Sequence, residues 1–320
     1  MSNLSNLLIF GATGTIGRYI TDAIVAARPS FGRIAIFTSP NTLHSKPDQL
    51  DALRRQGVDI LVGDLTNREE VRRAYEGIDT VVSALGRGAI AAQIPLIQLA
   101  NETPHIHRFL PSEYGTDIEY GPASVHERPH QQKLLVRAAL KEVRPSLEYA
   151  YVVTGPYADF PFYLGRSTRC PQAGTFDALA KQAVLLGDGT GRVSLSACDD
   201  VGQFVVHALT HWDGARNRAL KLNSFTTTPA DILAEFEAQT GAQWTVEYTS
   251  LDQLRSLERE AWAKEAPEAT GCTLRRIWTE GGTLYDRRDN EDIGVTETKT
   301  LGELVTGSIR SQVEGVPSRH

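Results

Sequence analysis

The chain has 320 residues, of which 41 % are hydrophobic and 22 % charged, enough to bury the core of one large α/β unit or of two unequal domains. Lys plus Arg total 33 and Asp plus Glu total 39, and the resulting formal charge of −6 argues against nucleic acid or an anionic membrane as the main partner. Cys170, Cys198 and Cys272 lie far apart without metal-ligand spacing, so neither a disulfide framework nor a structural metal site is expected.

The first half of the chain alternates short apolar runs with helical stretches, the pattern of βαβ units around a parallel sheet. We expect strands over residues 7–10, 34–37, 58–62, 80–83, 108–110 and 147–153. Between them we expect helices over residues 16–27, 48–56, 67–75, 93–100 and 129–143. The predicted fold class is therefore α/β, a Rossmann-type doubly wound parallel sheet with a smaller α/β substrate domain.

The regular alternation stops after Gly155. Residues 157–163 are rich in aromatics and prolines, which is typical either of a loop that lines an apolar pocket or of a packed connector. Further strands are expected over residues 193–196 and 220–223 and further helices over 200–209 and 230–240, whereas residues 262–290 are polar and irregular. We expect a dinucleotide-binding domain over residues 1–156, to which 193–226 return, and a substrate domain over 157–192 and 227–320.

The start of the chain and its apolar runs bear on location. Residues 1–10 lack a basic region and continue directly into a glycine loop instead of a cleavage site. Elsewhere no apolar run approaches the roughly 20 residues that a bilayer requires. We therefore expect a cytoplasmic protein without a membrane partner.

Segment 11–17 has glycines at its first, fourth and seventh positions and follows the first expected strand. The first glycine permits a tight turn, the second lets a pyrophosphate approach the backbone, and the third lets the next helix pack against the sheet. Free N–H groups at the start of that helix favour a bound phosphate. We therefore predict a bound dinucleotide in contact with Gly11, Thr13, Gly14, Thr15, Ile16 and Gly17.

The end of the second strand bears on which dinucleotide binds. An NAD enzyme normally has an acidic residue there for the ribose 2′-hydroxyl, whereas this chain has Thr38 and Ser39. Both hydroxyls can donate to a 2′-phosphate, and Lys46 follows closely enough to reach it, although no arginine occupies the position. We therefore expect NADPH, with NADH as the alternative.

Recognisable motifs lie at residues 11–17 (GATGTIG), 63–65 (GDL), 108–115 (RFLPSEYG), 133–140 (KLLVRAAL), 187–189 (GDG) and 199–202 (DDVG). Together they resemble the isoflavone-reductase-like branch of the NmrA-type atypical short-chain dehydrogenases, which includes phenylcoumaran benzylic ether and pinoresinol-lariciresinol reductases. The resemblance covers roughly residues 7–250 and is closest to a fungal-type member. It implies a Rossmann domain, a smaller substrate domain and NADPH-dependent reduction of an aromatic secondary metabolite.

The resemblance also implies roles for individual residues. Lys133 matches the family's catalytic lysine, and Gly63 and Asp64 match positions that border the adenine. Leu65 is a further implied cofactor contact. Further implied cofactor contacts are Ser83, Ala84, Leu85, Gly86, Pro111, Ser112, Lys133, Gly155 and Pro156. The chain departs from the family at Thr38, where arginine is common, and over residues 124–130, so the substrates of the plant enzymes are not transferred.

Lys133 lacks the partner of the usual short-chain dehydrogenase signature, a tyrosine four residues earlier, because Pro129 stands there and no Tyr-x-x-x-Lys occurs in the chain. The amine therefore acts alone or with a different partner, either as a base with a lowered pKa or as a protonated donor. His130 lies on the same helix face and is either a proton relay or a capping residue. Tyr114 could hydrogen-bond a substrate carbonyl, while Glu113 either contacts the substrate or fixes the loop.

We predict an NADPH-dependent reductase of an aromatic or polyketide-like metabolite, with Lys133, His130 and Tyr114 as catalytic residues. The predicted substrate contacts are Glu113, Tyr157, Phe160, Phe162 and Tyr163. Two alternatives stay open: a redox-neutral dehydratase, isomerase or cyclase on the same scaffold, and a non-catalytic NADP-binding regulator. Scattered carboxylates and the lack of a Gly-x-Ser-x-Gly elbow argue against metal and acyl-enzyme chemistry. The expected partner is a small aromatic or apolar molecule, and a homodimer is left open.

Overall fold

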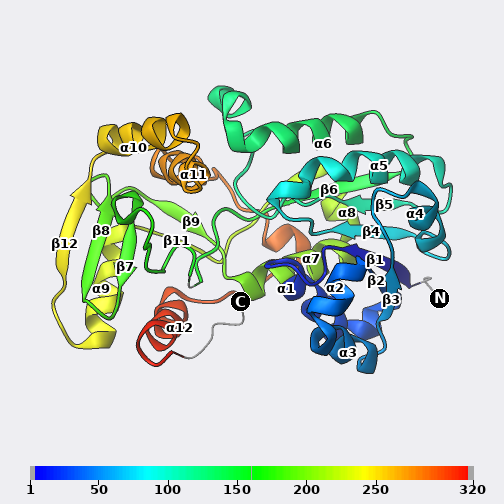
Figure 1. Cartoon of the computed structure of the whole chain (residues 1–320), viewed down its shortest axis with the longest axis horizontal. Helices are drawn as coiled ribbons and strands as arrows, with labels where there is room; N and C mark the ends of the chain where they lie inside the picture. The colour runs from blue at the N-terminus through cyan, green and yellow to red at the C-terminus, as the bar shows by residue number, and fades with distance from the viewer. Residues whose placement is uncertain (1–3, 160, 316–320) are drawn as a thin grey trace.

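Seven strands form the central sheet of the computed structural model, which describes residues 4–159 and 161–315 (Figure 1). Their order is β10-β6-β5-β4-β1-β2-β3, and every neighbouring pair is parallel. The strands are β1 (Ser5–Phe10), β2 (Phe31–Thr38), β3 (Asp59–Val62), β4 (Thr80–Ser83), β5 (Arg108–Leu110), β6 (Glu148–Val153) and β10 (Arg218–Lys221). The strand order reverses at β1, and ligands of such sheets bind at the carboxyl ends of the strands beside this point.

Helices cover both faces of the sheet because its strands are apolar on both sides. Leu7, Leu8, Ile9 and Phe10 of β1 are at most 1 % exposed. One face packs against α1 (Gly17–Ala26), α3 (Pro47–Arg55), α7 (Cys198–Thr210) and α8 (Trp212–Ala215). The other face packs against α4 (Arg68–Ala74), α5 (Gln93–Glu102) and α6 (Gln131–Lys141). This arrangement confirms the predicted Rossmann-type doubly wound sheet.

A smaller α/β part lies beside the carboxyl ends of the strands, on the left of Figure 1. Its three-stranded sheet has the order β12-β8-β7 and is covered by two helices, α9 and α12. Two more helices, α10 and α11, pack against each other. The elements of this part are β7 (Thr175–Asp177), β8 (Gln182–Leu186), β12 (Thr245–Thr249), α9 (Pro229–Thr240), α10 (Leu251–Ala263), α11 (Ala269–Thr279) and α12 (Leu301–Val313).

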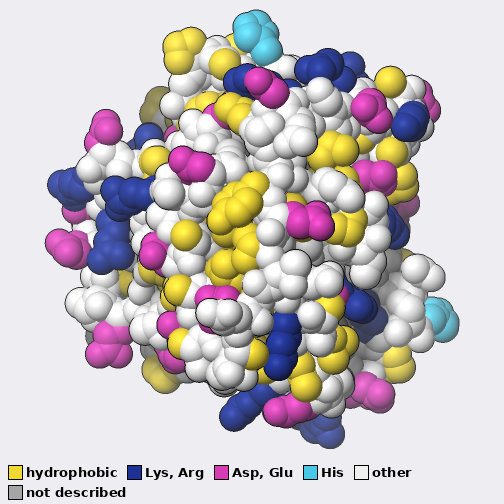
Figure 2. Space-filling view, turned by 90° about the vertical axis from the view of Figure 1, so that its left-hand side faces the viewer, with side chains coloured by type: hydrophobic (Ala, Val, Ile, Leu, Met, Phe, Trp, Pro, Cys, Tyr) yellow, Lys and Arg dark blue, Asp and Glu magenta, His cyan; other side chains and the backbone are white. Residues whose placement is uncertain are grey.

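The segment between the two parts crosses from one to the other. β9 (Val193–Leu195) pairs antiparallel with β11 (Phe225–Thr227), whereas β10 joins the central sheet beside β6. Figure 2 shows the outer end of the smaller part, where a band of apolar side chains crosses a surface that carries charges of both signs. The division into domains that we expected from the sequence stays a prediction.

The sequence located most strands and helices, and the structure corrects two expectations. The helix expected from residue 129 begins at Gln131, because Arg128–His130 form a 3-10 turn first. The stretch 262–290, expected to be irregular, contains the whole of α11. Contacts with α10 stabilise this helix: Trp262 donates to Thr273 Oγ1 at 2.8 Å.

Membrane-spanning helices and clusters of metal ligands are both absent from the described part of the chain. None of its helices is long and apolar enough to cross a bilayer. Across residues 4–159 and 161–315, no three His, Cys, Asp or Glu side chains are grouped so that they could hold a metal ion.

Candidate active site

The glycine loop forms the turn from β1 into α1. Gly11 has φ +74°, a conformation that side chains with a Cβ rarely adopt, and its carbonyl accepts from the Gly14 N–H at 2.9 Å. At Gly17 a Cβ would lie 1.9 Å from the Gly11 carbonyl oxygen, so only glycine fits where the helix meets the loop. The residue before α1, Ile16, makes no side-chain cap, which leaves the first N–H groups of the helix available to an anion.

The residues expected around the 2′-phosphate lie at the end of β2. Thr38 is buried as the last residue of the strand, and the Ser39 hydroxyl accepts from the Thr42 N–H at 3.1 Å as the N-cap of α2 (Pro40–Ser45). The Lys46 amine donates to the Thr13 carbonyl at 2.5 Å, so it reaches the glycine loop from the far end of α2. A positive charge therefore stands beside the loop on the β2 side.

Asp64 and Leu65 follow β3 at the sheet's outer edge. The Asp64 carboxylate accepts from the Thr66 N–H and hydroxyl, each at 2.8 Å, and the Thr66 bonds lower the pKa of this exposed carboxyl. Leu65 packs partly buried against the core. Neither residue lines the two cavities that lie at the carboxyl ends of the strands.

We call the first of these the loop cavity, because the glycine loop forms one of its walls. Its volume is about 530 Å³, and its lining includes predicted cofactor contacts from four separate segments. These are Gly14, Thr15, Ile16, Ala84, Leu85, Gly86, Ser112 and Lys133. The sequence therefore located most of this cavity, although Gln132, Arg128 and Trp262 also line it.

Ser112 lines the loop cavity and is fixed by hydrogen bonds to Leu85 and to the buried Gln93. The Ser112 hydroxyl donates to the Leu85 carbonyl at 2.8 Å, and the Ser112 N–H donates to Gln93 Oε1 at 2.7 Å. Gln93 in turn donates to the Ile90 carbonyl at 3.0 Å. Pro111 precedes this serine at the end of β5, and the buried Ser83 hydroxyl has no hydrogen-bond partner in the described chain. Sequence reasoning did not single out Gln93.

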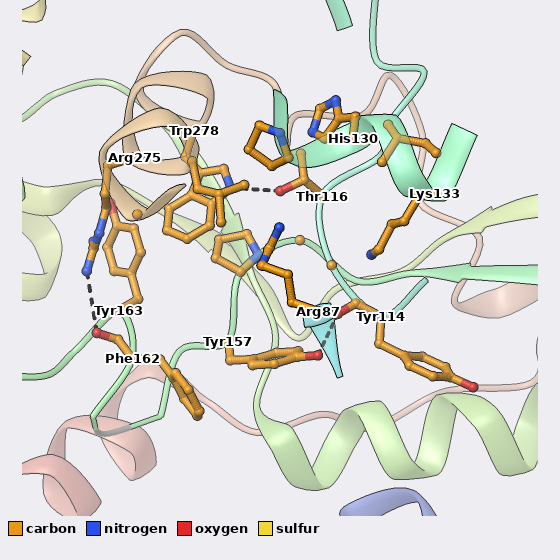
Figure 3. A pocket seen from close by; sticks show the side chains of 17 residues that line it. Arg87, Tyr114, Thr116, His130, Lys133, Tyr157, Phe162, Tyr163, Arg275 and Trp278 are labelled. Carbon is orange, nitrogen blue, oxygen red and sulfur yellow. Dashed lines mark hydrogen bonds between the residues drawn. The ribbon is translucent and has the colours of Figure 1, made fainter. Parts of the chain in front are cut away.

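The second cavity, which we call the aromatic cavity, adjoins the first and is shown in Figure 3. Its volume is about 330 Å³, and Tyr157, Phe162, Tyr163 and Trp278 contribute aromatic walls. Gly155 and Pro156 line this cavity and not the loop cavity, and their expected contact with the cofactor stays a prediction. The two cavities share Arg87, Tyr114, Pro129, Lys133, Tyr157 and Phe162.

Lys133 stands at the boundary between the two cavities, near the start of α6. Its amine donates to the Glu113 carbonyl, which fixes its direction (Figure 3 shows the side chain pointing into the aromatic cavity). Burial lowers the pKa of this amine to about 8, the Glu113 carboxylate opposes that effect, and the positive charges of Arg87 and Arg137 add to it. The amine is therefore mostly protonated at neutral pH and can release its proton with little cost.

A buried ion pair lies beneath Lys133. The Arg137 guanidinium donates to both Glu113 carboxylate oxygens, at 2.9 and 3.1 Å, and to Glu119 at 2.6 Å. Arg137 is 1 % exposed, and its guanidinium lies 4.4 Å from the centre of the Tyr151 ring. The Glu113 carboxylate is therefore occupied, contrary to the expected contact with a substrate, and it fixes the loop whose carbonyl holds Lys133.

His130 is buried beside the aromatic cavity. Its Nδ1 lies 2.9 Å from the Ser124 carbonyl, and because a carbonyl only accepts, Nδ1 carries the hydrogen in the neutral ring. Its Nε2 has no partner in the described chain, and burial lowers the pKa of the ring. Uncharged His130 therefore presents an acceptor nitrogen on the same helical turn as Lys133.

Tyr114 does not take the position expected of a substrate contact. Its ring is buried in the core that includes α1 and α7, and Figure 3 shows it pointing away from Lys133. Burial raises the pKa of its hydroxyl, which has no partner in the described chain. The Tyr114 carbonyl, by contrast, accepts from the Tyr157 hydroxyl at 2.5 Å and so fixes an aromatic wall of the cavity.

The sequence left open whether residues 157–163 line an apolar pocket or form a packed connector. In the structure Tyr157, Phe162 and Tyr163 of this loop line the aromatic cavity. Tyr157 and Phe162 pack edge to face at 5.4 Å, and Phe160 lies outside the described residues. Sequence reasoning missed Arg87, Arg275 and Trp278. Arg87 follows the end of β4, a position where ligands of α/β sheets bind, and that signal could have identified it. Arg275 and Trp278 lie on α11, where the sequence pattern gave no signal.

Comparisons with known proteins identify relatives that match most of the chain. The NmrA-like family model matches residues 3–270. An isoflavone reductase homologue of Nicotiana glauca is 28 % identical over 239 residues, which cover 73 % of this chain and 71 % of that protein. The isoflavone reductase of Pisum sativum is 27 % identical over 266 residues, 79 % of this chain and 81 % of that protein. No relative named here tests the expectation of a fungal-type member.

Solved structures share the fold. The binary complex of leucoanthocyanidin reductase with NADPH from Vitis vinifera has a TM-score of 0.79 at 21 % identity, covering 95 % of this chain and 99 % of that one. A protein solved with NADP⁺ and (+)-pinoresinol has a TM-score of 0.80 at 20 % identity, covering 96 % of this chain and 100 % of that one. At these identities the likeness establishes the fold, a Rossmann-type sheet with a smaller part beside it.

Proposed function

This chain belongs to the NmrA-like family, and on that premise we propose that it is an NADPH-dependent reductase of a small aromatic molecule. The observation that carries the proposal is the position of Lys133, which lines both the loop cavity and the aromatic cavity. A dinucleotide in the first cavity and a substrate in the second would meet at this amine. The names of the relatives and structures described above support the same activity.

The residues of the loop cavity fit a dinucleotide. The uncapped start of α1 and the close packing of Gly11 against Gly17 leave room and N–H donors for a pyrophosphate. At the end of β2, Thr38 and Ser39 stand where an NAD enzyme has a carboxylate, and the Lys46 amine is 2.5 Å from the glycine loop. These features favour the 2′-phosphate of NADPH over the 2′-hydroxyl of NADH.

The reaction that this arrangement supports is a two-electron reduction. NADPH supplies a hydride when bound. Protonated Lys133 donates its proton to the substrate oxygen that gains negative charge, so one hydride and one proton are added in total. The Glu113 carbonyl orients the amine for that transfer, and the buried ring of His130 presents an acceptor nitrogen one turn away.

Two measurements test the proposal in sequence. Calorimetric titration of the purified protein is expected to give a dissociation constant for NADPH about tenfold or more below that for NADH, because a charged hydrogen bond contributes about 1.5–3 kcal/mol. Lys46→Ala is expected to reduce that preference. Equal affinity for both dinucleotides, or affinity for neither, would contradict the cofactor assignment.

Turnover is then followed with a panel of aromatic ketones, enones and benzylic ethers, by loss of the near-ultraviolet absorbance of reduced nicotinamide. Lys133→Met is expected still to bind NADPH, because the glycine loop is intact, and to lose turnover about 10²–10⁴-fold at saturating NADPH, the contribution of a general acid. The matched control is Lys141→Met on the same helix, whose amine is exposed and pairs at 3.7 Å with Glu119. Substrate conversion without loss of that absorbance would identify a redox-neutral enzyme instead.

A further inference from the structure

The described lining of the aromatic cavity contains cationic side chains and no carboxylate. Its lining includes Arg87, Lys133 and Arg275, and within the described chain it includes no Asp or Glu. The chain as a whole has a formal charge of −6, so this local excess runs against the overall balance. A low-dielectric cavity of one sign concentrates ligands of the opposite sign.

Two other arginines near the site, Arg137 and Arg276, are neutralised by carboxylates. Arg137 is paired with Glu113 and Glu119, and Arg276, the neighbour of Arg275 in the sequence, pairs with Glu127 and Glu258 at 2.6 and 2.5 Å. Across the described residues, Arg87 and Arg275 have no ion pair with any carboxylate, and burial lowers the pKa of both. The chain therefore leaves uncompensated the two guanidinium groups that line the aromatic cavity.

The two unpaired guanidinium groups are held differently. Arg275 lies 4.3 Å from the centre of the Tyr163 ring and 5.5 Å from that of Trp278, and it donates to the Phe162 carbonyl at 3.4 Å. It is thus part of the aromatic wall. Arg87 makes no hydrogen bond to any described residue, and Figure 3 shows its side chain reaching into the middle of the cavity.

From this geometry we propose that the substrate is an aromatic carboxylate and that Arg87 binds its carboxylate group, with Arg275 adding positive potential along the aromatic wall. A guanidinium presents paired N–H donors that match the two oxygens of a carboxylate. The rings of Tyr163 and Trp278 supply apolar contact for the aromatic part of such a molecule. The inference rests on the proposed function, which fills the loop cavity with the cofactor and leaves the aromatic cavity to the substrate.

A phosphate of the cofactor is the other source of an anion, because Arg87 also lines the loop cavity. The glycine loop and the start of α1 already provide donors for the pyrophosphate, and Lys46 stands on the side of β2. Figure 3 shows Arg87 directed between Trp278 and Lys133. We therefore assign the guanidinium to the substrate and let the experiment separate the two anions.

The test uses NADP⁺-loaded protein and two probes that share one ring system, 4-hydroxycinnamate and its uncharged amide, with binding measured by calorimetry. Wild-type protein is expected to bind the acid about tenfold or more tightly than the amide. Arg87→Gln is expected to weaken binding of the acid about 10- to 100-fold and binding of the amide less than about twofold. The reason is that charged hydrogen bonds account for the difference in affinity between the two probes. The affinity of Arg87→Lys for the acid is expected to lie between those of the wild-type protein and Arg87→Gln, because lysine keeps the charge and loses the paired donors. Arg169→Gln, an exposed arginine on the smaller part, controls for net charge.

The outcomes separate this inference from the proposed function. Equal binding of acid and amide, or no binding of either, overturns the carboxylate assignment while leaving NADPH binding intact. Weaker NADP⁺ binding by Arg87→Gln, with the acid unaffected, assigns the guanidinium to a cofactor phosphate and also overturns it. Failure of wild-type protein to bind NADP⁺ refutes the proposed function, whereas an Arg87-dependent preference for the acid would still support the anion site.

Discussion

Replacing Arg137 tests the buried ion pair that supports Lys133. Arg137→Met leaves the Glu113 carboxylate buried without its two guanidinium bonds of 2.9 and 3.1 Å and also removes the 2.6 Å bond to Glu119. Breaking a buried pair by removing one partner costs about 3–5 kcal/mol, because the remaining charge stays desolvated. For a chain of this size we expect a melting temperature roughly 6–20 °C lower, at about 2–4 °C per kcal/mol.

The measurement is thermal or urea unfolding of the purified variant. Its matched control is Arg218→Met, which removes an ion pair of 2.7 Å with Asp289 from an arginine that is 41 % exposed, and which should cost at most about 1 kcal/mol. Glu113→Gln combined with Arg137→Met should recover part of the loss, since no unpaired charge then remains at that position. An Arg137→Met variant as stable as the Arg218 control would refute the reasoning that this pair is buried and structurally required.

Three further predictions concern the lysine proposed as proton donor, the glycine loop and a helix start. With a pKa of about 8, Lys133 should act as a proton donor at neutral pH. In a pH–rate profile, turnover should therefore be level below about pH 7 and fall about tenfold per pH unit above about pH 9. A turnover rate that rises above about pH 9 would indicate that Lys133 acts as a base. Gly17→Ala should abolish dinucleotide binding in a titration, because its Cβ would lie 1.9 Å from the Gly11 carbonyl, and unchanged affinity would disprove the loop geometry. Thr228→Ala should destabilise the chain by about 1 kcal/mol in urea unfolding, because Thr228 caps α9 in a reciprocal pair of bonds with Asp231; no change would mean that water replaces the cap.

The sequence was informative where local patterns decide the structure. Continuous apolar runs such as residues 7–10 identified buried parallel strands, and the glycine spacing identified the turn into α1. Local pattern also predicted the helix that carries Lys133, whereas the role expected of this lysine came from the family resemblance. These features depend on residues close together in the chain, so one sequence carries their signal.

The sequence did not predict contacts between residues that are far apart in the chain. The Glu113–Arg137 pair joins residues 24 positions apart, and no periodicity marks either as a partner of the other. Helix α11 starts without a side-chain cap and contains Gly271, so its contacts with α10, and not its own propensity, stabilise it. For that reason the wall formed by Arg275 and Trp278 could not be predicted, although it lies in the centre of the candidate site.

The boundary of the family match has a consequence for how this enzyme can diversify. The match ends at residue 270, and the α11 residues that line the aromatic cavity, Gly271, Leu274, Arg275 and Trp278, follow it. Changes in α11 can therefore alter which molecules are admitted without disturbing the turn after β1 or the amine of Lys133.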